Sequence, residues 1–218
     1  MLRKRNLGVL MALAIIIAFG FTACDELDGL LSGITPDDYG NLGVLEFELN
    51  EEKTGFIVSG GTVTTGAVVI PPAYPYNGEL LPVVEIADYA FRDPEKPMAT
   101  ITSVTIPSSV KIIGEYAFAL QSITSITLNE GLEIIRSSAF AGTKITSIKL
   151  PETLHTIRRE VFDWCKQLTS IRIPANVSYM GTLVFNHCDV LTTIYVDRGS
   201  EDGWDINWTG NCTADVIF

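Results

Sequence analysis

The feature that most constrains the fold is an apolar phrase that recurs along the chain and ends in phenylalanine. Its five copies end at Phe91, Phe118, Phe140, Phe162 and Phe185, so the successive separations are 27, 22, 22 and 23 residues. A unit of this length cannot bury its own apolar face, and a period in the low twenties is typical of stacked supersecondary units. The sequence therefore predicts a repeat solenoid with one buried ring per coil.

Each coil also contains a stretch in which apolar and polar residues alternate. The stretches begin at Thr102, Thr124, Thr146, Thr169 and Thr192. Alternation places Val, Ile or Leu on one face and Ser or Thr with a variable residue on the other, as in a short strand. Three stretches end in Pro, which cannot donate to a strand ladder and so ends the strand. We expect one short parallel strand per coil, followed by a short helical turn at the Ala-Phe or Val-Phe phrase.

The first residues have the pattern of an export signal. Arg3, Lys4 and Arg5 precede a charge-free apolar run that ends at Cys24, and this run is slightly shorter than the roughly 20 residues of a membrane-spanning helix. The stretch Phe21-Thr22-Ala23-Cys24 resembles the bacterial lipobox, which implies cleavage before Cys24 and lipidation of its thiol. A cleaved secretory peptide with an incidental Cys24 is the alternative.

Patterning divides the chain into five segments. We expect a lipoprotein signal peptide (1–23), an acidic flexible tether (24–42), an N-terminal hairpin cap with an expanded first coil (43–99), the repeats (100–196) and a C-terminal cap (197–218). Loss of 1–23 would remove three basic residues and no acidic one, which changes the formal net charge from −11 to −14. Such a negative field repels nucleic acid, so we expect no nucleic-acid partner.

The chain offers little catalytic chemistry. Its only histidines, His155 and His187, fall in different parts of their coils, and we find no nucleophile–His–acid arrangement and no phosphate-binding glycine loop. We therefore expect no enzyme activity, cofactor or metal. Cys165 and Cys188 stand three residues after their phenylalanines, so they could be buried thiols, a disulfide or, with His187, part of a metal site. Cys212 has no evident partner.

Two groups of outward residues are candidate binding surfaces. The first is the variable position of the strands, a polar to cationic column ending in an aromatic residue: Thr105, Thr127, Lys149, Arg172 and Tyr195. Solenoids bind partners through such faces. The second is the patch of Arg136, Arg158 and Arg159, whose like charges either need an acidic partner or are merely tolerated. An ordinary solvated sheet face is the alternative for the column.

These phrases together resemble a known family. The succession Leu-Thr-Ser-Ile-x-Ile-Pro, Val-x-x-Ile-Gly and Ala-Phe-x-x-Cys is similar to the BspA-like, or Treponema pallidum-type, leucine-rich repeats of bacterial surface proteins. The resemblance covers about residues 66–196. It implies a right-handed solenoid, lipid or cell-wall anchoring, and adhesion to host or bacterial surface proteins.

The leading hypothesis is a non-enzymatic, lipid-anchored envelope or cell-surface protein that presents a solenoid face to a protein partner on a host or neighbouring cell. One alternative is a glycan-binding accessory module, in which Trp164, Tyr195, Trp204 and Trp208 stack on sugar rings. A structural spacer without a ligand is the other alternative.

Overall fold

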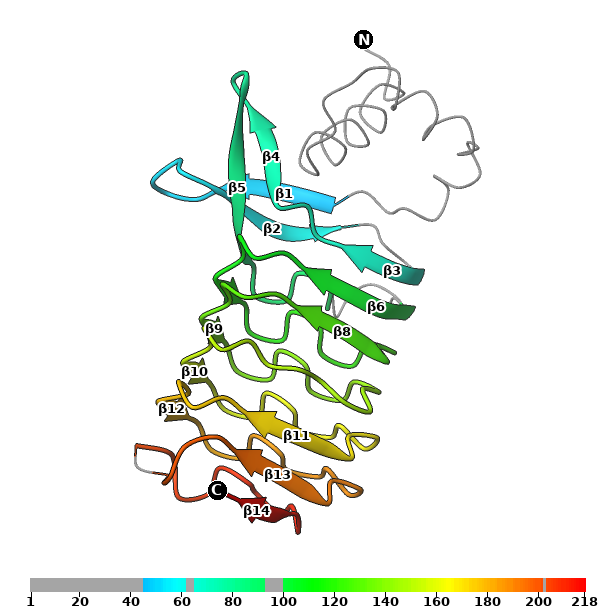
Figure 1. Ribbon diagram of the computed structural model, residues 1–218. Coiled ribbons are helices and arrows are strands. Elements are labelled where there is room, and N and C mark those ends of the chain that lie inside the picture. Colours follow the sequence, from blue (N-terminus) through cyan, green and yellow to red (C-terminus); the bar gives the residue numbers. More distant parts are fainter. Residues whose placement is uncertain (1–44, 62–64, 93–99, 202) are drawn as a thin grey trace, which may run out of the picture.

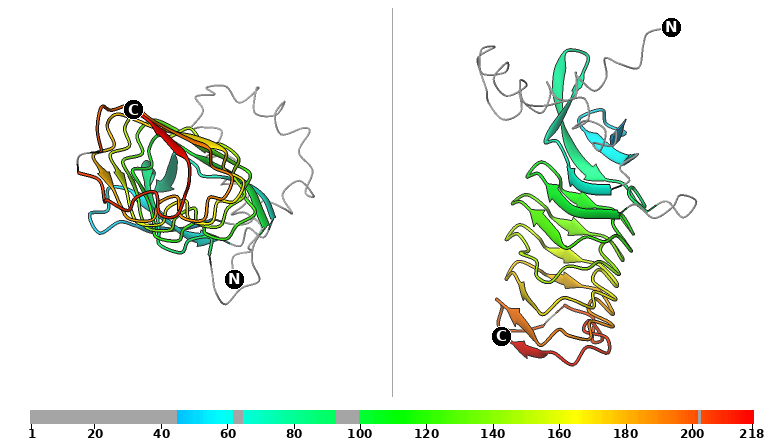
Figure 2. Two further views of the ribbon diagram at one scale, coloured as in Figure 1. Left: turned by 90° about the horizontal axis from the view of Figure 1, so that it is seen from below. Right: turned by 90° about the vertical axis from the view of Figure 1, so that its right-hand side faces the viewer.

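A computed structural model describes residues 45–61, 65–92, 100–201 and 203–218, and these form a β-solenoid (Figure 1). Successive coils superimpose when the stack is viewed from one end (Figure 2). The predicted signal peptide, tether and Cys24 lie outside the described residues. The described residues include no helix that could span a bilayer.

One side of the solenoid, the long-strand side, carries the predicted parallel strands. They are β3 (Thr65–Val69), β6 (Thr100–Ile106), β8 (Ser125–Leu128), β11 (Ser170–Ile173), β13 (Thr193–Val196) and β14 (Asp215–Ile217). They form two three-stranded sheets, β3-β6-β8 and β11-β13-β14. The coil between the sheets joins the second one through a single bridge from Lys149 to Arg172. In β8, β11 and β13 every second residue is buried, as the alternation predicts.

A second side carries a shorter strand in each coil, which the expectation of one strand per coil missed. These are β7 (Ile112–Ile113), β9 (Ile134–Ile135), β10 (Thr156–Ile157) and β12 (Tyr179–Met180). They extend a sheet that begins with β1 (Leu45–Leu49), β2 (Phe56–Gly61) and β5 (Glu79–Ile86) and continues in the order β7-β9-β10-β12. All neighbours after β2 in this order are parallel. Two residues are too few to show a period of two, so this short-strand side leaves no alternation in the sequence.

The expected helical turn before each phenylalanine is wrong, because the described residues contain no helix. The residue two places before each phenylalanine has a positive φ, for example +52° at Tyr116 and +58° at Glu160, which interrupts a right-handed helix. The backbone N–H of Phe118 donates to Ala139 O at 2.9 Å in the next coil. Along this turn, backbone bonds to the next coil alternate with single bonds inside the coil, such as Ala119 N–H to Tyr116 O, so no continuous run of helical bonds forms. We call these turns the turn side.

The five phenylalanines form the core of the stack. Phe118, Phe140, Phe162 and Phe185 are 0% exposed, and Phe91 is 7% exposed. Successive ring centroids are 5.0, 5.7, 5.9 and 5.7 Å apart, with ring planes within 12° of parallel. Aromatic pairs in this range of distances attract one another in addition to burying apolar area. The predicted buried ring in each coil is confirmed.

Both ends of the stack are covered. At one end β1 (Leu45–Leu49) and β2 (Phe56–Gly61) pair antiparallel, as do β4 (Ala73–Tyr76) and β5 (Glu79–Ile86). The second hairpin turns at Asn77-Gly78, where both φ values are positive, as a type I′ turn requires. At the other end Trp208 packs edge-on against Phe185, with ring centroids 5.9 Å apart. The solenoid fold with capped ends is thus confirmed.

Candidate functional site

The predicted column of outward side chains is present on the long-strand side. Strand register places Thr105 opposite Thr127, and it places Arg172 opposite both Lys149 and Tyr195. No strand pairing among the described residues joins Thr127 to Lys149, so the column has two segments. Register extends it by an exposed apolar residue at each end, which the sequence analysis did not include. The outward column therefore comprises Val69, Thr105, Thr127, Lys149, Arg172, Tyr195 and Ile217.

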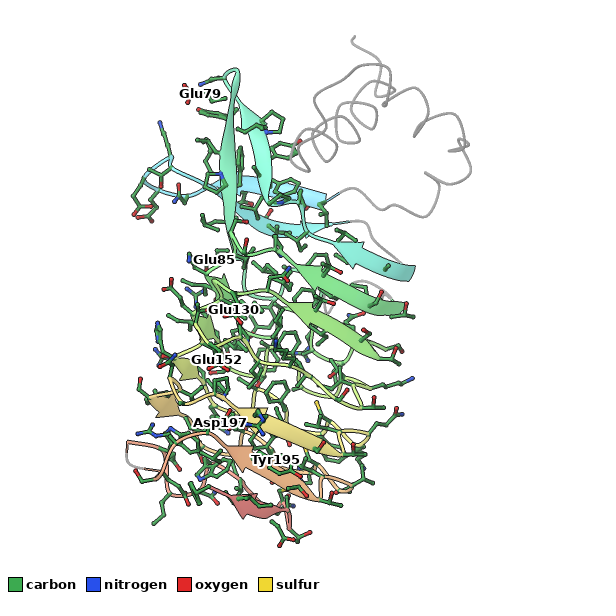
Figure 3. The ribbon with its side chains drawn as sticks, in the orientation of Figure 1. Glu79, Glu85, Glu130, Glu152, Tyr195 and Asp197 are labelled. Atoms are coloured by element: carbon green, nitrogen blue, oxygen red, sulfur yellow. The ribbon has the colours of Figure 1, made fainter. Side chains whose placement is uncertain are left out.

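The column is less cationic than its sequence suggests. Arg172 forms an ion pair with Asp197, and its guanidinium carbon lies 5.7 Å from the centroid of the Tyr195 ring. Tyr195 belongs to β13 and Asp197 follows that strand directly (Figure 3). No acidic partner of Lys149 lies in the described part of the chain. Sequence reasoning missed Asp197, although it occupies the repeat position that holds Pro107, Pro151 and Pro174 in other coils.

The arginine patch does not form a free cationic surface. Arg136 Nη1 lies 2.7 Å from Glu85 Oε1 and 3.1 Å from Asp88 Oδ1. Arg159 Nη2 lies 2.6 Å from Glu160 Oε1, and this contact raises the pKa of Arg159. The guanidinium carbon of Arg158 lies 5.4 Å from the centroid of the Tyr179 ring. Of the two alternatives for these stacked charges, acidic partners therefore balance Arg136 and Arg159.

The buried cysteines are free thiols that satisfy backbone carbonyls. Cys165 Sγ donates to Phe140 O at 3.4 Å, and Cys188 Sγ donates to Phe162 O at 3.1 Å. Gln121 makes the equivalent bond, with Nε2 2.8 Å from Phe91 O. Burial raises the pKa of the Cys165 thiol to about 11 and also raises that of Cys188. Of the three interpretations, the structure supports the buried thiols.

The histidines lie apart and each faces an acid. His155 Nε2 is 3.9 Å from Glu133 Oε2 on the short-strand side. On the turn side, His187 Nδ1 is 3.1 Å from Asp163 Oδ1, and burial raises the pKa of the Asp163 carboxyl. Among the described residues, no three His, Cys, Asp or Glu side chains are arranged to hold a metal ion.

The aromatic residues of the glycan alternative divide into two groups. Trp208 is 2% exposed, and Trp204 donates its Nε1 hydrogen to Val177 O at 3.0 Å, so both belong to the C-terminal cap. Trp164 and Tyr195 are 48% and 41% exposed. Only the latter two present a large part of their rings to solvent.

Comparison with known proteins identifies the repeat. The family model described as the BspA type leucine-rich repeat region matches residues 84–202 in six copies, which is more than half of the chain. The chain belongs to the BspA-type leucine-rich repeat family. This BspA-type protein is similar to a leucine-rich repeat protein of T. pallidum, with 30% sequence identity, a TM-score of 0.61, and coverage of 74% of this chain and 70% of that one.

Two longer solved proteins are also similar to the BspA-type chain. A leucine-rich repeat protein from Bacteroides ovatus has 26% identity and a TM-score of 0.49, with coverage of 69% of this chain and 45% of that one. The pneumococcal vaccine antigen PcpA shares the fold at 22% identity and a TM-score of 0.52, with coverage of 67% and 43%. No curated protein is detectably similar in sequence. Repeat solenoids of this kind are commonly interaction modules, because their stacked coils expose a continuous face.

Proposed function

We propose that this protein binds another protein through the outward column and has no enzymatic role. The observation that supports this proposal is a contrast between the two faces of the same strands. The inward positions repeat Val, Ile and Leu, whereas the outward positions change from hydroxyl to cation to aromatic. The need for a stable coil explains why the inward residues are alike but does not explain why the outward residues differ. The outward residues are therefore the ones that would determine which partner binds.

The chemistry of the column suggests how a partner would be recognised. Tyr195 is 41% exposed, and the guanidinium of Arg172 packs against its ring. Aromatic and arginine side chains often carry the binding energy of an interface. Lys149, whose charge has no acidic partner in the described residues, would select a partner surface with a carboxylate, because an unbalanced cation disfavours a cationic partner.

The proposal includes export and a lipid anchor at Cys24. Its support is the positive n-region, the apolar run and the position of Cys24 at the end of that run. Several acyl chains on one residue would hold the protein firmly at a membrane. Fatty-acid labelling in cells should disappear in Cys24→Ala, with accumulation of uncleaved precursor. Unchanged labelling would show that Cys24 is not the anchor.

The chain offers a matched control for the binding surface. Lys149, Arg172 and Tyr195 on the long-strand side have counterparts of the same residue types on the short-strand side, namely Lys111, Arg158 and Tyr179. In both sets the arginine lies over the tyrosine ring, at 5.7 and 5.4 Å. Replacing either set by alanine therefore removes the same side chains and a similar contact from two different faces.

The test is binding of the purified protein to a panel of host and bacterial surface proteins, with cell adhesion as the second readout. We expect at least one partner, weakened by about tenfold or more in Lys149→Ala/Arg172→Ala/Tyr195→Ala. The control Lys111→Ala/Arg158→Ala/Tyr179→Ala should bind normally. Equal loss in both triple variants would refute the outward column as the site. Absence of any partner, with normal adhesion of cells that lack the protein, would favour the spacer alternative.

A further inference from the structure

One coil on the turn side carries small residues where its neighbours carry large ones. Ser138 follows Tyr116 and precedes Glu160 in one column of left-handed residues, whose φ values are +52° to +58°. Gly142 holds the corresponding place between Leu120 and Trp164 in a second column, with φ values of +59° to +70°. The missing side chains leave a notch of about 160 Å³, lined by residues from both columns and by Arg92 and Asp163.

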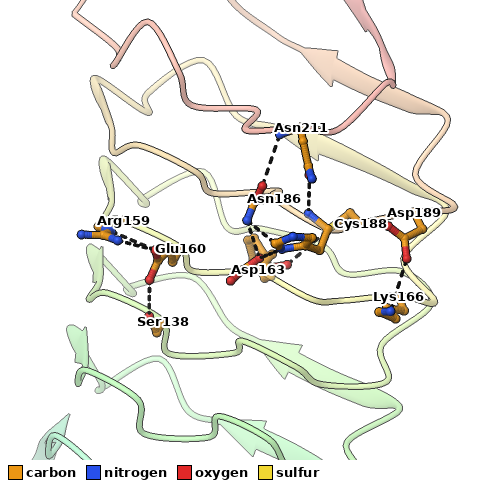
Figure 4. Close-up of polar contacts among 11 residues, drawn as sticks. Ser138, Arg159, Glu160, Asp163, Lys166, Asn186, Cys188, Asp189 and Asn211 are labelled. Atoms are coloured by element: carbon orange, nitrogen blue, oxygen red, sulfur yellow. Dashed lines mark hydrogen bonds and ion pairs between the residues drawn. The ribbon is translucent and has the colours of Figure 1, made fainter.

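The two ends of this notch carry opposite charges. At one end the guanidinium carbon of Arg92 lies 4.7 Å from the centroid of the Tyr116 ring. At the other end are the carboxylate of Asp163, which is 17% exposed, and the carboxylate of Glu160, whose Oε1 is paired with Arg159. Ser138 Oγ lies 3.4 Å from Glu160 Oε2, which fixes that carboxylate against the small coil (Figure 4). The Asp163 carboxylate would repel a simple anion, and the Arg92 guanidinium would repel a simple cation, so neither ligand suits both ends of the notch.

The Asp163 carboxylate is oriented by the following coil. Asn186 Nδ2 lies 3.1 Å from Asp163 Oδ1 (Figure 4). His187 Nδ1 lies at the same distance from that oxygen. Oδ2 receives neither of these bonds, so one oxygen of a positioned carboxylate remains for a donor in the notch. The side chain of Asp163 is only 17% exposed, and a hydrogen bond to a carboxylate in such a place is stronger than one at the open surface.

Apolar and aromatic side chains complete the walls. Leu120 and Trp164, from the two coils beside the small one, are 46% and 48% exposed. Trp164 is fixed by His187, with ring centroids 4.4 Å apart, and by Lys166, whose Nζ lies 4.5 Å from the ring centroid. Tyr89, also 46% exposed, stacks on Tyr116 at 5.2 Å and lengthens the aromatic strip. Rigid aromatic side chains at a surface contribute contact area at little cost in conformational entropy.

We propose that the notch binds one sugar ring of a glycan. A neutral ring with several hydroxyl groups can donate to Asp163 and Glu160 and accept from Arg92, while its C–H surface contacts Leu120 and Trp164. No single-charge ligand matches both ends of the notch, whereas this ligand class matches both ends and the apolar wall. The site lies on the turn side, so it is separate from the outward column and adds a second binding activity to the proposed protein-binding one.

The experiment is a glycan array with the purified protein, followed by titration of the best array glycan in solution. Asp163→Asn keeps an acceptor for Asn186 and His187 but removes the carboxylate charge, and Trp164→Ala removes the apolar wall. Each should weaken binding by about tenfold, as expected for one charge-assisted hydrogen bond or one stacking contact. Ala141→Leu, which fills the notch with an apolar side chain, should abolish binding.

Tyr195→Ala is the matched control, since it removes an exposed aromatic ring from the outward column. Its glycan affinity should equal that of the unaltered protein, and circular dichroism should show that all four variants are folded. The proposal is overturned if no glycan binds, if Ala141→Leu and Trp164→Ala bind normally, or if Tyr195→Ala alone loses binding. It is also overturned if the notch variants lose only a protein partner, because the notch would then be a protein contact.

Discussion

Replacement of Phe140 by alanine is the perturbation for which the structure gives the clearest magnitude. The ring is 0% exposed and lies between Phe118 and Phe162, with centroid separations of 5.7 and 5.9 Å. Its removal forfeits burial worth about 1.5–3 kcal/mol. It also leaves a cavity that the flanking coils cannot close without breaking their own bonds. Together these effects predict a loss of about 3–5 kcal/mol in the free energy of unfolding.

Two further variants separate the contributions. Phe140→Leu keeps most of the apolar volume but loses both ring pairs, so it should cost about 1–3 kcal/mol. Phe91→Ala should cost less than Phe140→Ala, because Phe91 is 7% exposed and has one stacked phenylalanine rather than two.

These losses would be measured by equilibrium urea unfolding, monitored both by tryptophan fluorescence and by far-ultraviolet circular dichroism. Coincidence of the two transitions is needed before a single free energy is assigned, since repeat proteins can unfold in parts. A loss below about 1 kcal/mol for Phe140→Ala, or an equal loss for Phe91→Ala, would refute the phenylalanine column as the main core of the stack.

Three other predictions concern local chemistry. In a variant that lacks Cys24, a thiol reagent at pH 8 should label Cys212 in the native protein. It should label the buried Cys165 and Cys188 only after denaturation, because burial raises the pKa of Cys165 to about 11. Labelling of Cys165 in the native protein would contradict this. Burial raises the pKa of Asp163 in the folded protein above the ordinary 3.8. The protonated Asp163 therefore contributes stability that is fully present below pH 3.8 and is lost as the pH rises through the folded-state pKa. As the pH rises through this range, the melting temperature of the unaltered protein should fall relative to that of Asp163→Asn. A difference in melting temperature that does not change with pH would argue against the raised pKa. Gly181→Ala should lower the free energy of unfolding by about 1–3 kcal/mol in chemical denaturation, because the added Cβ would lie 2.6 Å from Arg159 N. A neutral effect would show that the coils can move apart.

The sequence predicted those parts of the fold that produce a regular spacing or alternation of residue types along the chain. The spacing of the phenylalanines predicted the stack, and alternation predicted the long strands and the outward direction of Lys149, Arg172 and Tyr195. The predicted helical turn failed because the N–H of Phe118 bonds to the next coil rather than within its own. A backbone hydrogen bond between coils does not change the order of apolar and polar residues, so the sequence pattern could not predict it.

Other features were missed for different reasons. The β4–β5 hairpin carries a turn signal in Asn77-Gly78, but the neighbouring Pro75 and Pro82 are unfavourable in the interior of a sheet. Both prolines occupy the hairpin in the structure. The ion pair between Arg172 and Asp197 depends on the register between adjacent coils. The notch depends on what is absent at Ser138 and Gly142 relative to their neighbours, which becomes visible only when three coils are aligned.

The central claim is that function lies on the outward column, where the repeat varies, while the uniform interior supplies stability. The most direct test measures affinity for a protein partner and the melting temperature in the same two triple variants. The claim predicts that Lys149→Ala/Arg172→Ala/Tyr195→Ala loses binding by about tenfold or more and keeps its melting temperature, while Lys111→Ala/Arg158→Ala/Tyr179→Ala keeps both. Unchanged partner affinity in the first variant would contradict it.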